Sequence, residues 1–202
     1  NTIRALEDEG LDREDIAFKL AEEFATGETG DFETDDEKID AAVRTAIALL
    51  TEGVVAAPID GIGQIELQKN DDGTTFIRVP YYGPIRSAGG TGQALSVLVA
   101  DYIRQQLDLA PFQPREVEVH RYVEEMDLYD GEVGLQYMPK EKETKLIIEN
   151  CPIMLDGVQT TDREVGGYRD LERIEGNRGR GGMCLVVGEG IAQKAPKIQK
   201  FR

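Results

Sequence analysis

The sequence predicts an α+β fold, with a helical N-terminal part at residues 1–52 beside a mixed core at residues 53–202. Three observations support this prediction. Apolar residues recur at helical spacing in the first fifty positions. Strand-like segments of alternating apolar and polar residues flank a turn at 70–73. A glycine-rich loop then leads into an apolar helix. A chain of 202 residues, 40% of them apolar, is long enough to bury a substantial core.

Two helices are expected in the N-terminal part. Asp12 and Asp15 form a capping-box-like pair before the first helix, and the run from Thr34 to Glu37 forms a second box. Acidic residues in a first helical turn interact favourably with the macrodipole, so these carboxylates do not indicate a metal site. The second helix is expected to end at Gly53. The apolar positions of the two helices are Ile16, Leu20 and Phe24 in the first and Ile39, Val43, Ile47 and Leu50 in the second.

A β-hairpin follows the apolar run at 54–58. Its strands are expected at 64–69 and 75–79, and the sequence Asn-Asp-Asp-Gly at 70–73 supplies the turn. Turn chemistry accounts for both aspartates of this sequence. The second strand leads directly into the glycine loop.

The glycine loop begins at Gly83 and opens a helix that runs to about residue 107. Its glycines permit positive φ and close approach of another molecule, and Thr91 stands where an N-cap would lie. Backbone N–H groups and a helix dipole at such a position suit an anion such as phosphate, and Arg86 adds a charged donor. The expected buried face of the helix is Leu95, Leu98, Val99, Tyr102 and Leu107.

This loop matches neither the P-loop pattern nor the dinucleotide G-x-G-x-x-G pattern, because Ala88 and Gly89 stand where the P-loop needs Gly and Lys. ATP and NAD are therefore not indicated. The alternative is that the glycines only shape a tight strand-to-helix connection and contact no ligand.

The middle of the chain predicts a helix at 114–129, a helix at 140–150, and short strands at 132–138 and 152–158. His120 faces away from the apolar row of the first of these helices and has no catalytic partner at a recognisable spacing. Cys151 and Cys184 are expected to be isolated buried thiols rather than metal ligands or a disulfide. The inward positions of the 114–129 helix are Val119, Tyr122, Val123, Met126 and Tyr129.

A second loop, at 176–182, combines glycine with arginine. Arg178 and Arg180 alternate with glycine, which leaves guanidinium groups unobstructed for bidentate phosphate contacts. The alternative is that these arginines only pair with nearby carboxylates of the protein.

The formal net charge is −16, and the acidic residues are unevenly distributed. Residues 1–52 hold 16 acidic and 5 basic residues, whereas residues 173–202 hold 7 basic and 2 acidic residues. This composition is typical of a protein from an extreme halophile, where salt screens phosphate binding and contacts depend more on geometry. No apolar stretch is long enough to span a membrane and no signal peptide is recognisable, so a cytoplasmic protein is expected.

Four sequence blocks resemble the N-terminal region of the large subunit of the archaeal family D DNA polymerase. They are Gly-Pro-Ile-Arg-Ser-Ala-Gly-Gly-Thr at 83–91 with the following 94–102, the segment 41–58, Arg-Tyr-Val-Glu-Glu-Met at 121–126, and the segment 177–198. The blocks occur in the order found in that family and cover nearly the whole chain.

The resemblance implies a much longer subunit with a double-psi β-barrel active site, acting with a small subunit that carries a proofreading nuclease. It also implies a KH-like element, for which the strand, loop and helix at 75–107 are the candidate. The family's catalytic aspartates lie in a later segment, so no catalytic residue is expected here and the fragment alone should be inactive. Mg²⁺ is expected for the full enzyme, and no metal ligand is expected in this fragment.

Three functions are compatible with these observations. The first is a DNA-contacting part of a polymerase, the second is a scaffold for domain and subunit contacts that does not touch nucleic acid, and the third is an independent phosphate-metabolite enzyme. The third is disfavoured because no pair of nucleophile and base is recognisable. The nucleic-acid-binding residues expected under the first function are Arg86, Ser87, Gly89, Gly90, Thr91, Arg178 and Arg180.

Overall fold

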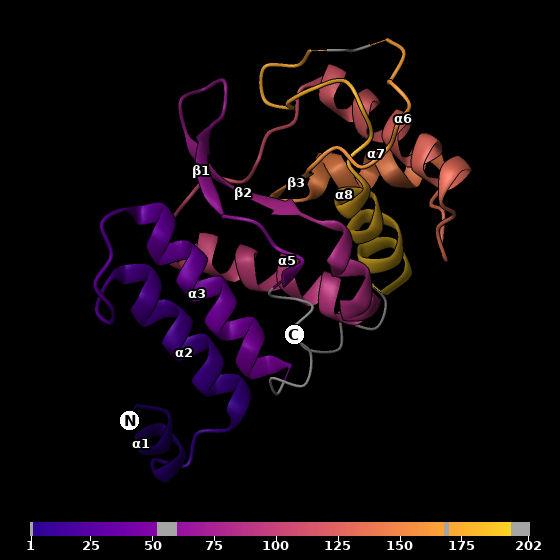
Figure 1. The fold of residues 1–202 in the computed structure, drawn as a ribbon. Coiled ribbons are helices and arrows are strands. Elements are labelled where there is room, and N and C mark those ends of the chain that lie inside the picture. Colours follow the sequence, from indigo (N-terminus) through magenta and orange to yellow (C-terminus); the bar gives the residue numbers. More distant parts are fainter. Residues whose placement is uncertain (1, 52–59, 168–169, 195–202) are drawn as a thin grey trace.

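The computed structural model describes residues 2–51, 60–167 and 170–194, and it has the predicted α+β architecture (Figure 1). The run at 54–58 and the predicted helix end at Gly53 lie outside the described residues. In chain order the elements are α1 (Thr2–Asp8), α2 (Arg13–Thr26), α3 (Asp35–Leu50), β1 (Glu66–Lys69), β2 (Thr75–Tyr81), the 3₁₀ helix η1 (Gly83–Ala88), α5 (Gly89–Gln106), α6 (Glu116–Glu132), α7 (Glu141–Asn150), β3 (Met154–Gly157), α8 (Gly181–Leu185) and the π-helix η2 (Val186–Ala192).

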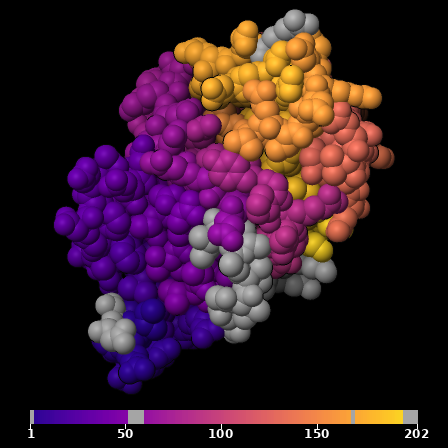
Figure 2. Space-filling model, in the orientation of Figure 1, coloured from indigo at the N-terminus to yellow at the C-terminus, as the bar shows by residue number. Residues whose placement is uncertain are grey.

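The N-terminal helices begin and end as their capping residues predict. The Asp12 carboxylate accepts a hydrogen bond from the N–H of Asp15 at 2.9 Å, and α2 ends at Gly27, whose φ is 80°. Thr34 and Glu37 form a complete capping box at the start of α3. The helices α2 and α3 pack against each other and gather at one end of the molecule, which Figure 2 shows in indigo and violet.

The sheet has the strand order β1-β2-β3, with β1 antiparallel and β3 parallel to β2. Arg78 lies opposite Glu66 on one side and Met154 on the other. The predicted hairpin and the strand within 152–158 are confirmed. The strand expected at 132–138 is wrong, because α6 continues to Glu132 and the chain then forms a loop.

Side chains of α3 cover the outer edge of β1. The carboxylates of Asp36 and Asp40 accept hydrogen bonds from the N–H groups of Leu67 and Ile65, at 3.0 and 3.2 Å. Arg44, one turn further along α3, donates to two carbonyls just before the strand. Polar groups that an edge strand would leave unpaired are thus satisfied within the chain.

Helix α5 crosses the middle of the molecule, between the N-terminal helices and the group formed by α6, α7 and α8 (Figure 1). It begins at Gly89 with Ala88 as its N-cap, so the predicted N-cap at Thr91 is wrong. Val99 is buried as expected, but Leu95, Leu98 and Tyr102 are only half-buried. The buried face instead combines small, apolar and polar residues, namely Gly92, Gln93, Ala94, Ser96, Val97, Val99, Ala100, Asp101 and Ile103.

One apolar cluster connects the N-terminal helices with the rest of the chain. Ile39 and Ile47 of α3 belong to the same cluster as Phe76 of β2, Ile103 of α5 and Met126 of α6. The proposed boundary between residues 52 and 53 falls in the part that the structure leaves undescribed. In the described part of the chain, no helix is long and apolar enough to cross a membrane.

Candidate nucleic-acid interface

Arg86 lies at a surface formed by η1, the loop at 133–137 and the end of η2. Its side chain is 41% exposed, and its Nη2 lies 3.4 Å from Oε1 of the buried Glu189 and 3.2 Å from the carbonyl oxygen of Gly134. Both contacts are long for a charge-assisted hydrogen bond. They orient the guanidinium and leave it accessible to another molecule.

Lys194 brings a second positively charged side chain to the start of α5, next to this surface. A Cβ atom built on Gly90 would lie 2.7 Å from Cε of Lys194 and still closer to the carbonyl oxygen of Glu189. The lysine side chain therefore passes directly over Gly90, at the start of α5. We call the surface formed by Arg86, Ser87, Gly89, Lys194 and residues 133–137 the Arg86 face.

The other predicted residues of this loop differ in what they can contact. Ser87, Gly89 and Thr91 are exposed. Gly89 has φ of 70°, and a Cβ built on it would meet nothing within 4 Å, so the surface around it is open. Gly90, in contrast, packs against the backbone of η2, and its lack of a side chain serves the packing of two helices.

The second predicted loop does not form one exposed arginine surface. Arg178 is exposed and its backbone forms a bridge with Glu164, but Arg180 is fully buried. The prediction that Arg180 contacts nucleic acid is therefore corrected, because its guanidinium is enclosed by protein. The exposed arginine of this loop is Arg178.

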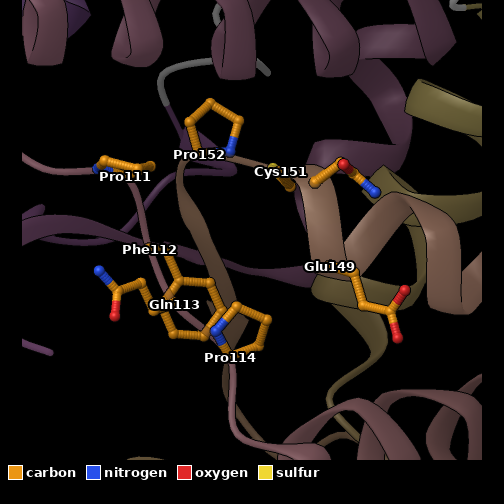
Figure 3. Close-up of a pocket in the computed structure, with 8 residues that line it drawn as sticks. Pro111, Phe112, Gln113, Pro114, Glu149, Cys151 and Pro152 are labelled. Atoms are coloured by element: carbon orange, nitrogen blue, oxygen red, sulfur yellow. The ribbon is translucent and has the colours of Figure 1, made fainter. Parts of the chain in front are cut away.

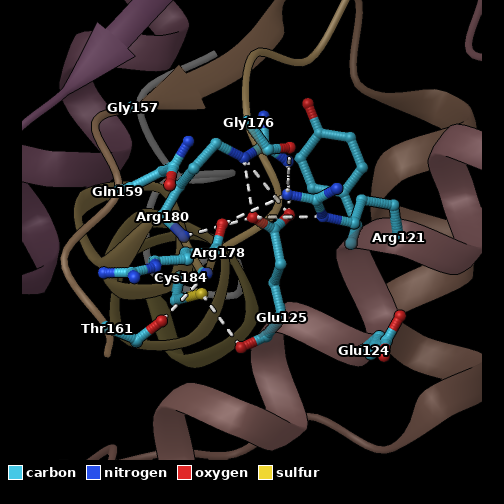
Figure 4. Close-up of polar contacts among 12 residues, drawn as sticks. Arg121, Glu124, Glu125, Gly157, Gln159, Thr161, Gly176, Arg178, Arg180 and Cys184 are labelled. Atoms are coloured by element: carbon cyan, nitrogen blue, oxygen red, sulfur yellow. Dashed lines mark hydrogen bonds and ion pairs between the residues drawn. The ribbon is translucent and has the colours of Figure 1, made fainter. Parts of the chain in front are cut away.

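Arg180 lies at the centre of a buried ion network (Figure 4). Its Nη2 is 2.6 Å from Oε2 of Glu125, and its Nη1 is 2.7 Å from Oδ1 of Asp156. The guanidinium also lies over the ring of Tyr122, 4.6 Å from the ring centroid. Arg78 donates to the other carboxylate oxygen of Asp156 at 2.5 Å, so the network ties α6, β3 and β2 to the second loop.

This arrangement determines the charge state of Asp156. Burial alone would raise the pKa of the carboxyl, but the charges of Arg180 and Arg78 outweigh burial, and the pKa lies below its usual value. Asp156 is thus ionised in the folded protein at neutral pH.

The glycines of the second loop are also explained by packing. A Cβ on Gly181 would collide with the side chains of Thr160 and Tyr129, and a Cβ on Gly182 would collide with the backbone of Tyr81 at the end of β2. Only glycine allows this approach. The second loop is therefore a structural junction apart from the exposed Arg178.

A separate hollow of about 490 Å³ lies between residues 111–114 and 149–152 (Figure 3). The N–H of Phe112 donates to the carbonyl oxygen of Pro152 at 2.9 Å and holds the two walls together. Cys151 is at the wall, and burial raises the pKa of its thiol to about 12, so it is not an activated nucleophile. The hollow has proline and phenylalanine walls and a single carboxylate, Glu149.

Among residues 2–51, 60–167 and 170–194, no group of three or more His, Cys, Asp or Glu side chains is arranged to hold a metal ion. His120 is half-exposed and its Nε2 lies 3.7 Å from Glu116 on the same helix. Cys151 and Cys184 are free and buried, as the sequence predicts. The Mg²⁺ expected for the full enzyme is not assigned to these residues.

Sequence reasoning missed two residues of the Arg86 face, Tyr137 and Lys194, and the buried Glu189 that contacts Arg86. Glu189 lies about a hundred positions from Arg86, and η2 had not been predicted as a helix. No local sequence signal identifies Glu189 as a partner of Arg86; it lies in a π-helix, and such helices are frequent at functional sites.

The fold and this surface define an α+β region that exposes Arg86 and, in the described part, has no group of side chains arranged to hold a metal ion. The whole chain, residues 1–202, matches the family described as DNA polymerase II large subunit DP2, N-terminal. The chain belongs to this family, which confirms the resemblance to the archaeal polymerase large subunit.

Relatives named DNA polymerase II large subunit are similar over nearly the whole chain. The protein of Haloarcula marismortui is 62% identical over 98% of this chain, and that of Natronomonas pharaonis is also 62% identical over 98%. The Methanosarcina barkeri protein is 55% identical over 98%. The chain spans 14% of the Haloarcula protein and 17% of each of the other two.

Proposed function

We propose that this chain is a non-catalytic N-terminal part of a replicative DNA-directed DNA polymerase large subunit, and that it contacts the DNA backbone at the Arg86 face. The family assignment supports the polymerase context. The observation that carries the DNA contact is the exposed guanidinium of Arg86, weakly paired and adjacent to Lys194 and to the open surface at Gly89.

Each residue of this face has a defined role in the proposal. Arg86 offers a planar fork of donors to a phosphate, and Lys194 offers a second positive charge. The hydroxyl groups of Ser87 and of Thr91, which is exposed beside the face on the first turn of α5, would donate to phosphate oxygens. Gly89 leaves room for the nucleic-acid backbone to approach.

The chemical step belongs to the rest of the enzyme in this proposal. Mg²⁺ and the catalytic carboxylates would be supplied by a later part of the large subunit, and proofreading by the small subunit. The fragment alone would therefore have no polymerase activity, while the complete two-subunit enzyme would transfer nucleotides.

A second candidate is a scaffold that fixes domain and subunit contacts without touching DNA. The observation that favours it is the burial of Arg180, together with the close packing of Gly181 and Gly182, which gives the second loop a structural role. The two candidates differ in the effect on DNA affinity that they predict when the charge of Arg86 is removed.

The test is fluorescence anisotropy of a labelled primer–template with the complete two-subunit polymerase over a salt series. Arg86→Ala should weaken binding about equally for all DNA sequences and reduce the slope of log K against log salt by about 0.9 per lost phosphate contact. Arg4→Ala, which removes an exposed arginine from α1 at the other end of the molecule, is the matched control for net charge.

Arg178→Ala tests the exposed arginine of the second loop in the same assay. Wild-type affinity and slope in both Arg86→Ala and Arg178→Ala would contradict DNA contact and would favour the scaffold. A loss of affinity in Arg4→Ala equal to that in Arg86→Ala would also contradict a local contact at the Arg86 face.

A further inference from the structure

We propose that the ring of Tyr137 stacks on an unpaired base, so that the Arg86 face binds single-stranded nucleic acid. This inference rests on the proposed function and specifies its ligand. It follows from the position of a partly exposed aromatic residue on the same loop that contacts Arg86 and Glu189.

Glu189 connects Tyr137 with Arg86. A single carboxylate oxygen, Oε1, accepts from the N–H of Gln136 at 3.0 Å and lies 3.4 Å from Nη2 of Arg86. Tyr137 is the next residue after Gln136, and its backbone carbonyl oxygen packs against Gly188 of η2. The loop that carries the Tyr137 ring is therefore fixed to η2, whose Glu189 also contacts the guanidinium of Arg86.

The ring of Tyr137 is held by a hydrogen bond and is partly exposed. The Tyr137 hydroxyl is 3.2 Å from both carboxylate oxygens of Glu143, and the residue is 36% exposed. The hydrogen bond to Glu143 raises the pKa of the phenol, so the hydroxyl stays protonated. Val133, 51% exposed, adds apolar surface to the same loop.

An unpaired base fits this surface better than a duplex. In a duplex the base faces are stacked inside, whereas in a single strand they can stack on an aromatic side chain. Glu132 and Glu143 lie near the loop, and a duplex would bring a phosphate charge about every 1.7 Å of its axis towards them. A single strand can place a base on the ring and one phosphate near Arg86.

Stacking also suits the composition of the chain. A net charge of −16 repels polyphosphates, and high salt screens the attraction that Arg86 and Lys194 provide. Contact between an aromatic ring and a base does not depend on that attraction. The two kinds of contact can therefore be separated by their salt dependence.

The experiment measures binding of a fluorescein-labelled oligothymidylate to the complete two-subunit polymerase over a salt series. Tyr137→Ala should weaken binding about 5- to 150-fold at every salt concentration and leave the salt slope unchanged. Tyr137→Phe keeps the ring and should bind like the parent. Ile3→Ala, which shortens a residue of similar exposure in α1, is the surface control and should also bind like the parent.

Cross-linking gives a local readout in the same enzyme. An oligonucleotide containing 5-iodouracil, whose photochemistry favours stacked aromatic rings, should cross-link to a peptide that contains Tyr137. Tyr137→Ala should remove that cross-link, and melting curves of the variants establish that the protein remains folded.

The outcomes distinguish this inference from the function on which it rests. If Arg86→Ala lowers the salt slope for DNA but Tyr137→Ala binds the oligothymidylate like the parent, backbone contact stands and base stacking is wrong. If neither variant differs from the parent, both proposals are wrong. If Tyr137→Ala lost as much affinity for a fully paired duplex as for the oligothymidylate, recognition of an unpaired base would be wrong.

Discussion

Individual arginines with the same sequence context have opposite roles in this protein. Arg178 and Arg180 both alternate with glycine, which predicts accessible guanidinium groups, yet only Arg178 is exposed. The partners of Arg180 are Glu125 and Asp156, at 55 and 24 positions from it in the chain. Such pairing depends on the tertiary fold, so local sequence could only leave it open as an alternative.

The first prediction concerns the buried carboxylate of Asp156. Its pKa in the folded protein lies below the ordinary value of 3.8, because Arg180 and Arg78 outweigh the effect of burial. Its ionisation therefore stabilises the fold fully above about pH 3.8, and this stabilisation is lost as the pH falls through the folded pKa. Asp156→Asn should lower the free energy of unfolding at pH 6 by about 1.5–3 kcal/mol, because Arg180 and Arg78 lose the carboxylate that they share and keep only Glu125 and Glu66 as charged partners.

On acidification, the free energy of unfolding of Asp156→Asn should fall less than that of the parent protein. The measurement is urea unfolding of parent and Asp156→Asn at a series of pH values between about 6 and 3. An unchanged difference in stability across this range would contradict a lowered pKa at this carboxyl.

Among the elements, the sequence predicted helices better than their packing. Capping by Asp12 and by Thr34 with Glu37 is local, so the starts of α2 and α3 could be predicted from a few residues. The buried face of α5 could not, because polar Gln93 and Ser96 lie inside it. The hydroxyl of Ser96 bonds within the fold to Tyr81, which no periodicity of apolar residues reveals.

The second prediction tests whether Gly90, at the start of α5, is needed for tight packing against η2. Gly90→Ala should destabilise the protein by about 1–3 kcal/mol, because the new methyl group would collide with the backbone of Glu189. In an open helix the same change would stabilise by up to about 1 kcal/mol. Gly131→Ala in α6 is the matched control, since a Cβ there meets nothing within 4 Å. Thermal melting of the two variants should shift in opposite directions, and a stabilised Gly90→Ala would contradict tight packing of α5 on η2.

At the scale of the whole molecule, charge distribution and family resemblance were predictable, and the assembly of the Arg86 face was not. The numbers of acidic and basic residues in each part of the chain can be counted directly from the sequence. The excess of acidic residues agrees with the relatives, which include proteins of halophilic archaea. The face needs η1, the loop at 133–137 and the end of η2 together, and these are about fifty residues apart in sequence. The packing of α5 and α7 against η2 and of α8 against η1 brings them to one place, and these contacts join segments that are distant in the sequence.

The last prediction is that low salt destabilises this protein. The first 52 residues hold sixteen acidic residues, and the fifteen that fall within the described residues 2–51 lie at the end of the molecule formed by α1, α2 and α3 (Figure 2). The Debye length grows from about 3 Å at 1 M salt to about 30 Å at 0.01 M, so repulsion among these residues extends across several helices when salt is removed. Exposed ion pairs such as Lys38 with Asp35 gain some strength at low salt, but such pairs contribute at most about 1 kcal/mol each.

The repulsion should therefore dominate, and the melting temperature should fall on dilution of salt, by about 2–4 °C for each kcal/mol lost. The measurement is thermal unfolding followed by circular dichroism at salt concentrations between those limits. A double variant, Glu7→Gln with Asp8→Asn, removes two exposed charges from α1 and should reduce the fall. A melting temperature that does not change with salt would contradict the adaptation to high salt. If the melting temperature of the double variant fell as much as that of the parent protein, repulsion among the charges of α1 would not be the cause of the fall.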